Sequence, residues 1–141
     1  MKKITLLTAL VFSLTMMFSS PSFAEWKKAL TSSDGSIFYV NTEAFRKIDG
    51  EIYYWTLIDL AQKKYKSTSK ETLSYKIYTR GDCNLIRRKI ITVIAYSNPM
   101  GEGSITAQKE FDNPKWQHLP PSSNDYGIIE GLCALKEFPK E

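Results

Sequence analysis

The sequence contains two cysteines, Cys83 and Cys133, and a bond between them would join two segments that lie about 50 residues apart in the chain. In an exported protein such a pair is expected to form a disulfide. Closing a loop of this length would stabilise the fold by about 4 kcal/mol, because it restricts the unfolded chain. The alternative is a reactive thiol, which would need a neighbouring base. The single histidine, His118, stands at no special spacing from either cysteine, so we predict the structural disulfide Cys83–Cys133.

Residues 1–24 have the pattern of a secretory signal peptide. Two lysines precede an uncharged apolar stretch at 4–18, and small residues occupy the positions that a signal peptidase recognises before Ala24. The apolar stretch is shorter than the roughly 20 residues that span a bilayer, so we predict cleavage after Ala24 rather than a membrane anchor. The new N-terminal residue would be Glu25 and not cysteine, so no lipid anchor is expected. Residues 25–141 are of a length that suits one domain.

Charge and motifs argue against several classes of protein. The sequence has 19 Lys and Arg against 15 Asp and Glu, and two of the lysines belong to the predicted leader, so the remainder is only weakly basic. Nucleic-acid binding is therefore not expected, least of all in an exported protein. There is no nucleophile elbow, phosphate loop or spaced carboxylate pair, and we expect no catalytic residues. One histidine and two paired cysteines make no metal site of a usual type, so neither a metal nor a cofactor is predicted.

Most of the chain after the leader has the pattern of short antiparallel strands. Thr72–Arg80 alternates cleanly between apolar and polar residues, as in a half-buried strand. Asp49-Gly50 predicts a tight reversal, and Gly81-Asp82 predicts another turn, after which a strand begins at Cys83. Four other predicted strands contain β-branched and aromatic residues, and they are Ser36–Asn41, Glu51–Leu60, Cys83–Tyr96 and Ser104–Phe111. Glu25–Leu30, with Trp26 and Ala29 around two lysines, could be a first strand.

The C-terminal part changes to a helical period. Apolar residues recur at three- and four-residue spacing from Tyr126 to Cys133, and Ser122, Ser123 and Asn124 are candidate N-caps. One helix near residues 123–135 is therefore predicted. The fold class is α+β, with a single antiparallel β-sheet and a C-terminal α-helix packed on one face. Because Cys133 lies on the apolar stripe of the helix, the disulfide would tether the helix to the sheet.

Several motifs also occur in the order found in a known family. They are "YYWTLIDL", "LSYKIYTRGDCNLIRRK", "YSNPMGEG", Trp116 and a final "LC". This series, from about Phe38 to Cys133, resembles the surface-adhesin protein E family of exported bacterial proteins. The resemblance implies a multi-stranded sheet with a disulfide-tethered helix, and attachment to extracellular matrix-type glycoproteins. The chain departs from the family in having Pro121-Ser122-Ser123 where Pro-Gly-Ser is usual, and it lacks a lipid-site cysteine.

The basic run Arg87, Arg88 and Lys89 is the candidate partner-binding site. A cationic cluster would suit an acidic partner, whereas isolated charges at the end of a strand would be ordinary solvated residues. Alternation along a regular strand sends Arg88 to the opposite face from Arg87 and Lys89. The three residues are therefore not expected to form one patch on a regular strand.

The strand pattern also suggests a homodimer. Ile86, Ile90, Ile94 and Tyr96 would share one face, and one helix covers only the other face of a sheet. A patch of this kind is commonly buried against a symmetric copy. The alternative is that the "AQKKYKSTSKE" connection or the N-terminal strand folds over it.

Two functions are compatible with these observations. The first is a non-catalytic exported binding module, adhesin-like by resemblance, with a protein or host glycoprotein as its partner. The second is a periplasmic accessory or structural protein that binds envelope components. Both place the protein outside the cytoplasm, in the periplasm, in the medium or at the cell surface, without a membrane span once the leader is removed.

Overall fold

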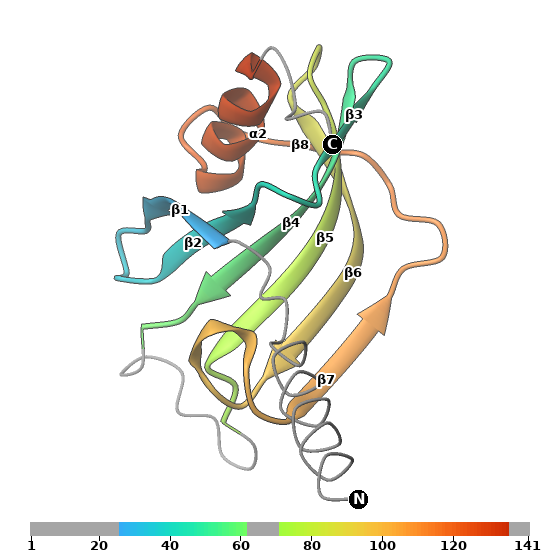
Figure 1. The fold of residues 1–141 in the computed structure, drawn as a ribbon. Helices are drawn as coiled ribbons and strands as arrows, with labels where there is room; N and C mark the ends of the chain where they lie inside the picture. The colour runs from blue at the N-terminus through green and yellow to red at the C-terminus, as the bar shows by residue number, and fades with distance from the viewer. Residues whose placement is uncertain (1–25, 62–70, 136–141) are drawn as a thin grey trace, which may run out of the picture.

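The structure is a computed structural model, and it describes residues 26–61 and 71–135. The predicted signal peptide, its cleavage site and the residue Glu25 lie outside the described residues, as does most of the connection that follows Ala61. The described part forms one antiparallel sheet and a C-terminal helix, α2 (Figure 1). The predicted fold class is therefore confirmed.

The sheet has the strand order β1-β2-β4-β5-β6-β7, with two short additional strands. β3 pairs with β4, and β8 pairs with β6. All these pairings are antiparallel, and the long central strands β4, β5 and β6 curve across the molecule (Figure 1). The strands are β1 (Trp26–Thr31), β2 (Ile37–Asn41), β3 (Arg46–Ile48), β4 (Glu51–Asp59), β5 (Ser74–Asp82), β6 (Arg87–Tyr96), β7 (Ile105–Glu110) and β8 (Gln117–His118).

The Asp49-Gly50 reversal is confirmed and joins β3 to β4. Asp49 has φ 50° and Gly50 has φ 77°. Two successive residues with positive φ are typical of the tight hairpin turn that matches the twist of its strands. The sequence did not predict β3 itself, because its three residues, all exposed, carry too little hydrophobic pattern.

The turn between β5 and β6 differs from the prediction. Gly81 and Asp82 belong to β5, and the chain reverses after them. Asp82 Oδ1 accepts hydrogen bonds from the backbone N–H groups of Asn84 and Leu85 at 2.8 and 3.4 Å, which holds these residues in a turn. The prediction that a strand begins at Cys83 is therefore wrong, and Cys83 lies in the turn.

Helix α2 (Asn124–Ala134) lies against one end of the sheet, and it begins where the sequence predicts. Of the three candidate caps, Ser123 takes the N-cap position, and its hydroxyl oxygen accepts a hydrogen bond from the backbone N–H of Tyr126 at 3.2 Å. Ile129 is fully buried and belongs to the same core cluster as Ile52 and Tyr54 of β4. Burying one side chain of this size contributes about 1.5–3 kcal/mol. The predicted disulfide Cys83–Cys133 is present and joins the helix to the β5–β6 turn.

The opposite face of the sheet is covered at its other end by the connection between β6 and β7. This connection contains the short 3-10 helix η2 (Pro99–Gly101). Ser74 Oγ donates to the carbonyl oxygen of Asn98 at 2.6 Å and accepts from the N–H of Gly101 at 2.8 Å. The connection thereby packs over Leu57, which is fully buried. Cover for this face thus comes from a segment that the sequence analysis did not consider.

Candidate functional site

One face of the sheet carries cationic and aromatic side chains in rows that cross β4, β5 and β6. It lies opposite to α2, because its residues alternate with Ile52 and Tyr54, which pack against the helix. The register places Tyr53 beside Arg80, and Arg80 beside Lys89. We call this surface the helix-free face. It comprises Tyr53, Trp55 and Leu57 of β4, Lys76, Tyr78, Arg80 and Asp82 of β5, and Arg87, Lys89, Thr92, Ile94 and Tyr96 of β6.

Three cations of this face surround the indole ring of Trp116. Arg87 Cζ lies 4.3 Å from the ring centroid, Lys89 Nζ lies 4.8 Å from it, and Arg80 Cζ lies 5.3 Å from it. Each such cation–π contact stabilises the arrangement by about 0.5–1 kcal/mol where it is exposed to water. We call these four residues the Trp116 cluster.

Strand β8 positions Trp116. The two residues that follow it, Gln117 and His118, pair with Arg88 and Arg87 at the start of β6. The short ladder brings the preceding indole to the edge of the helix-free face. Half-buried Trp116 therefore comes from a segment distant in sequence from the cations that it contacts.

Two carboxylates orient the arginines of the cluster. Glu51 accepts two hydrogen bonds from Arg80, at 2.7 and 3.0 Å, and this bidentate pair raises the pKa of the Arg80 guanidinium. Asp82 accepts one from Arg87 Nε at 2.8 Å. Burial alone would raise the pKa of the Asp82 carboxyl, but the hydrogen bonds from Arg87 and from the turn backbone outweigh it and lower the pKa. Both arginines are thus fixed in place by charge-assisted bonds.

The cluster keeps hydrogen-bonding capacity that the described residues do not use. Within residues 26–61 and 71–135, Arg87 donates only through Nε, so its two terminal amino groups have no acceptor there. Lys89 has no carboxylate within ion-pair distance in the same ranges. These donors lie around one aromatic ring and are available to an acidic ligand.

Aromatic side chains extend the face away from the cluster. Trp55 and Tyr78 stack with ring centroids 4.9 Å apart and an interplanar angle of 27°. Tyr53 lies in the same row as Arg80 of the cluster, and the guanidinium carbons of Arg46 and Arg80 are each 5.8 Å from its ring centroid. Cationic and aromatic groups are therefore adjacent along the strands, with rows about 7 Å apart.

The structure divides the predicted basic run between the two faces. Arg87 and Lys89 belong to the Trp116 cluster, and Arg88 points to the opposite side. Arg88 Nη1 lies 2.8 Å from Asp125 Oδ1 in the first turn of α2. Arg88 is therefore part of the contact between helix and sheet, and the candidate binding site retains two of the three predicted residues.

The four residues of the predicted dimer patch do not share one face. Ile90 pairs with Thr79 on the helix side of the sheet, whereas Ile94 and Tyr96 lie on the helix-free face. The reason is a bulge at Ile91, where β6 has one more residue than β5, so the alternation reverses. Ile86 lies in the turn before β6, with φ 44°, and packs against the core. The predicted patch was wrong in its geometry, and the homodimer stays a prediction.

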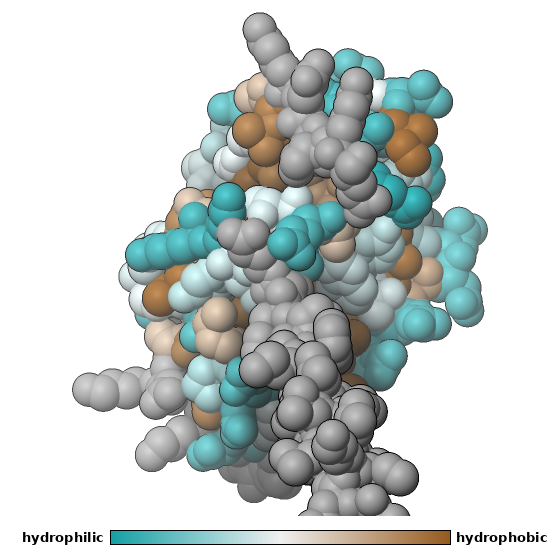
Figure 2. Space-filling view, viewed as in Figure 1, coloured by the Kyte–Doolittle hydropathy of each residue, from teal (hydrophilic) through white to brown (hydrophobic). Residues whose placement is uncertain are grey.

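Exposed apolar side chains are likewise scattered over the surface and do not form one continuous patch. On the face drawn in Figure 2, hydrophobic residues form separate patches among hydrophilic ones. The large hydrophobic side chains that are exposed in the described residues lie on different elements. They are Ile48, Leu85, Ile105, Phe111 and Leu135.

The positions of Arg80 and Trp116 in the Trp116 cluster could not be predicted from the sequence. Trp116 lies in a polar, proline-containing segment with no strand pattern, and β8 is too short to be recognised. The available signal was the tryptophan itself, a large aromatic residue between Lys115 and Gln117 in a polar loop. Arg80 ended a predicted strand and had no visible partner, because Glu51 lies far away in sequence.

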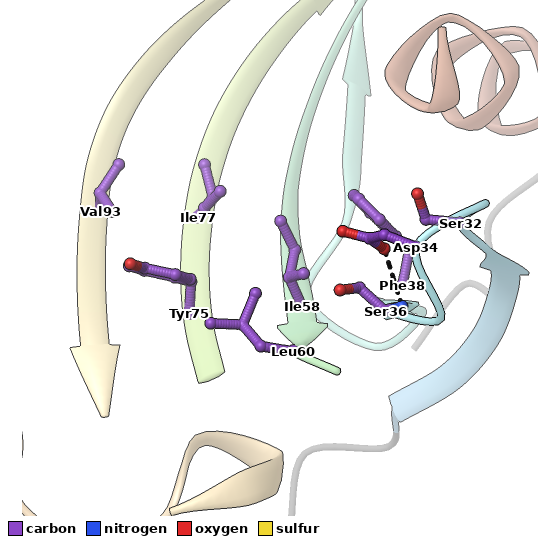
Figure 3. A pocket seen from close by; sticks show the side chains of 9 residues that line it. All are labelled: Ser32, Asp34, Ser36, Phe38, Ile58, Leu60, Tyr75, Ile77 and Val93. Atoms are coloured by element: carbon purple, nitrogen blue, oxygen red, sulfur yellow. Dashed lines mark hydrogen bonds between the residues drawn. The ribbon is translucent and has the colours of Figure 1, made fainter. Parts of the chain in front are cut away.

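A hollow lies on the helix side of the sheet, beyond the end that α2 covers. Its floor is apolar and comes from three neighbouring strands, with Ile58 on β4, Ile77 on β5 and Val93 on β6 (Figure 3). The hollow has a volume of ≈ 360 Å³. At its rim, Asp34 Oδ1 accepts a hydrogen bond from the backbone N–H of Ser36 at 2.9 Å. The floor offers hydrophobic contact and little charge.

Residues 26–61 and 71–135 contain no group of three or more histidine, cysteine or acidic side chains that could hold a metal ion. No helix in that part of the chain has the length and apolar character needed to cross a bilayer.

Comparison with solved structures finds the same fold in another protein. The structure of Haemophilus influenzae protein E is 13% identical in sequence, with 81% of this chain and 87% of that chain covered and a TM-score of 0.56. The crystal structure of protein E from non-typeable Haemophilus influenzae is 14% identical, with 82% and 79% covered and a TM-score of 0.58. At this level of identity the likeness concerns the fold. Comparison with curated protein sequences gave no match.

The family comparison agrees with the resemblance in the motifs. The family model described as surface-adhesin protein E matches residues 26–134. The match includes every strand of the sheet, both cysteines and the whole of α2. The chain belongs to the surface-adhesin protein E family.

Proposed function

We propose that this protein is a non-catalytic, exported binding module of the adhesin type, and that the Trp116 cluster is its contact site. The observation that carries the proposal is the convergence of Arg80, Arg87 and Lys89 on one indole ring. The cations come from two strands and the ring from a third segment, so the fold itself assembles the site.

The electrostatics of the cluster favour an acidic partner. Glu51 and Asp82 hold the two arginines before any ligand binds, so little side-chain freedom is lost on association. The ammonium of Lys89 supplies charge that a partner can neutralise, and the terminal amino groups of Arg87, whose charge is already paired with Asp82, supply hydrogen-bond donors. Family membership supports the adhesin-like character, and attachment to matrix-type glycoproteins is the form of it that we propose.

The proposed location is outside the cytoplasm, as the leader-like residues 1–24 suggest. The alternative is a periplasmic accessory protein that binds envelope components with the same site. The two functions differ in whether the Trp116 cluster reaches the outside of the cell. Cell fractionation combined with protease treatment of intact cells separates them, because only a surface protein is cut.

Binding itself is tested with immobilised laminin, fibronectin and vitronectin, and with an isolated cell-envelope fraction. The variants are Lys89→Gln and Trp116→Leu, and the control is Lys109→Gln. Lys109 loses the same charge but lies on the other face of the sheet, because it pairs with Val93 of β6. We expect the first two variants to weaken binding at least several-fold and the control to leave it unchanged. Equal binding by all three variants would disprove the assignment of the site.

A further inference from the structure

We propose that the helix-free face binds an extended sulfated polysaccharide, with sulfate groups at the Trp116 cluster and a sugar ring on the Trp55–Tyr78 stack. This inference rests on the proposed function, since it names the class of ligand for the same site. It follows from the position of charged and aromatic rows beside one another on a single sheet face.

The charged groups of the Trp116 cluster favour sulfate as a ligand. Arg87 Cζ and Lys89 Nζ lie 4.3 and 4.8 Å from the same ring centroid, so the two cations are close enough for neighbouring anionic groups of one chain to contact both. Arg87 has two terminal amino groups without an acceptor among the described residues, and a planar guanidinium can donate two parallel hydrogen bonds to oxyanion oxygens. A sulfate group presents three such oxygens.

The aromatic row beside the cluster favours a sugar ring. Trp55 and Tyr78 stack against each other on the same face of the sheet, and both are half-buried, so each ring keeps an outer surface that the other ring does not cover. The C–H groups on one face of a sugar ring carry a small positive charge and pack against the negative face of an aromatic ring. The row that contains Trp55 is two residues along β4 from the row that contains Arg80, which corresponds to about 7 Å. Neighbouring units of a polysaccharide can span this distance.

The charged and aromatic rows together favour a glycan over an acidic protein segment. A carboxylate-rich peptide would neutralise Lys89 and Arg87, but it has no flat apolar face to place on the Trp55–Tyr78 stack. A sulfated polysaccharide offers anionic groups and sugar faces in alternation, and so matches both rows. The site would therefore bind heparin-like chains more tightly than a peptide of equal charge.

The test measures binding of the purified, oxidised protein to heparin, to chemically desulfated heparin and to poly-glutamate of similar length by titration calorimetry at several salt concentrations. The variants are Lys89→Gln, which removes charge, and Trp55→Leu, which removes the aromatic surface. Lys109→Gln is the control of equal charge change. Each variant is first checked for a melting temperature close to that of the parent protein, and Tyr78→Leu replaces Trp55→Leu if the latter is unstable.

We expect heparin to bind at least tenfold more tightly than desulfated heparin or poly-glutamate. Lys89→Gln should weaken heparin binding several-fold and reduce its dependence on salt, because one fewer counterion is released from the polyanion. Trp55→Leu should weaken it several-fold without changing the salt dependence.

Three results would overturn the inference. They are no heparin binding, equal binding of poly-glutamate, and equal effects of Lys89→Gln and Lys109→Gln. If the protein still binds a matrix glycoprotein in a manner sensitive to Lys89→Gln while heparin fails, the proposed function stands and only the ligand class is wrong.

Discussion

Arg88 of β6 and Asp125 of α2 form an ion pair, with Arg88 Nη1 2.8 Å from Asp125 Oδ1. The pair joins the sheet to the first turn of the helix, where a carboxylate also interacts favourably with the helix dipole. Tyr54 is buried close to it, and burial, together with the charge of Asp125, raises the pKa of the Tyr54 phenol. The helix is thus held near its N-terminal end by this ion pair and near its C-terminal end by the disulfide.

The ion pair should contribute to stability as a coupled unit. We expect the double-mutant cycle of Arg88→Met and Asp125→Asn to give a coupling free energy of about 1 kcal/mol or more, because both side chains are partly buried. The comparison pair is Arg80→Met with Glu51→Gln, where the arginine is twice as exposed, at 36% against 18%. Its coupling should be smaller. Chemical denaturation measures both cycles, and a zero coupling for Arg88 and Asp125 would contradict the role given to them.

Loss of the disulfide should destabilise the protein strongly. Replacing both cysteines, Cys83→Ser and Cys133→Ser, opens a loop with a sequence separation of 50. The expected loss is about 4 kcal/mol, which corresponds to a fall in melting temperature of more than about 10 °C. The parent protein in reducing agent should melt like the double variant, and amide exchange should increase most in α2. An unchanged melting temperature would show that the bond does not restrain the helix.

The Asp82 carboxylate should make stability depend on pH in the acid range. Its pKa is lowered in the folded state, so its contribution is fully present above the unfolded pKa of about 4 and is lost as the pH falls through the lower, folded pKa. Asp82→Asn should therefore lower the melting temperature at pH 7 by several degrees, and the difference from the parent should shrink toward pH 2. Calorimetry at a series of pH values measures this. If the difference in melting temperature between Asp82→Asn and the parent stayed constant with pH, the charge of Asp82 would not contribute to stability.

Two glycine substitutions should have opposite effects. Gly131 lies inside α2, and an added Cβ would have no atom within 4 Å, so Gly131→Ala should stabilise the protein by about 1 kcal/mol through helix propensity. At Gly81 of β5 an added Cβ would lie 2.9 Å from Ile52 Cγ1 and 3.4 Å from Ile129 Cδ1 in the core. Gly81→Ala should destabilise by about 1–3 kcal/mol through overpacking. Urea denaturation tests both, and an effect of the same sign at both sites would contradict the packing described.

Much of the fold could be predicted from local pattern. Alternation gave β5, and β-branched and aromatic residues gave the other long strands. The Asp49-Gly50 pair gave its hairpin, and a capping serine with three- and four-residue spacing gave α2. The turn after β5 could not be placed correctly, because it depends on the side chain of Asp82 accepting from the backbone two and three residues later. The bulge at Ile91 was also hidden, since nothing in an apolar run marks which residue is extra.

The candidate site was only partly visible in the sequence. Arg87 and Lys89 stood out as charges, and strand alternation correctly separated Arg88 from them. Their meeting with Trp116 depends on the two-residue strand β8, and the orientation of Arg80 depends on a cross-strand carboxylate. Both are contacts between distant segments, which local periodicity does not encode.

The covalent link between Cys83 and Cys133 also determines how the molecule would respond to mechanical tension. A force applied between the two ends of the chain passes through the sulfur bridge, so the residues between the cysteines bear no load. The sequence separation between the two cysteines is 50. At about 3.3–3.6 Å per extended residue, the bridge shortens the length that the chain can reach under force by roughly 170 Å. Strands β1 to β5 could unravel under tension while β6, β7, β8 and α2 stay within the closed loop. Arg87, Lys89 and Trp116 all lie in that protected loop, whereas Arg80 lies in the segment that carries the load.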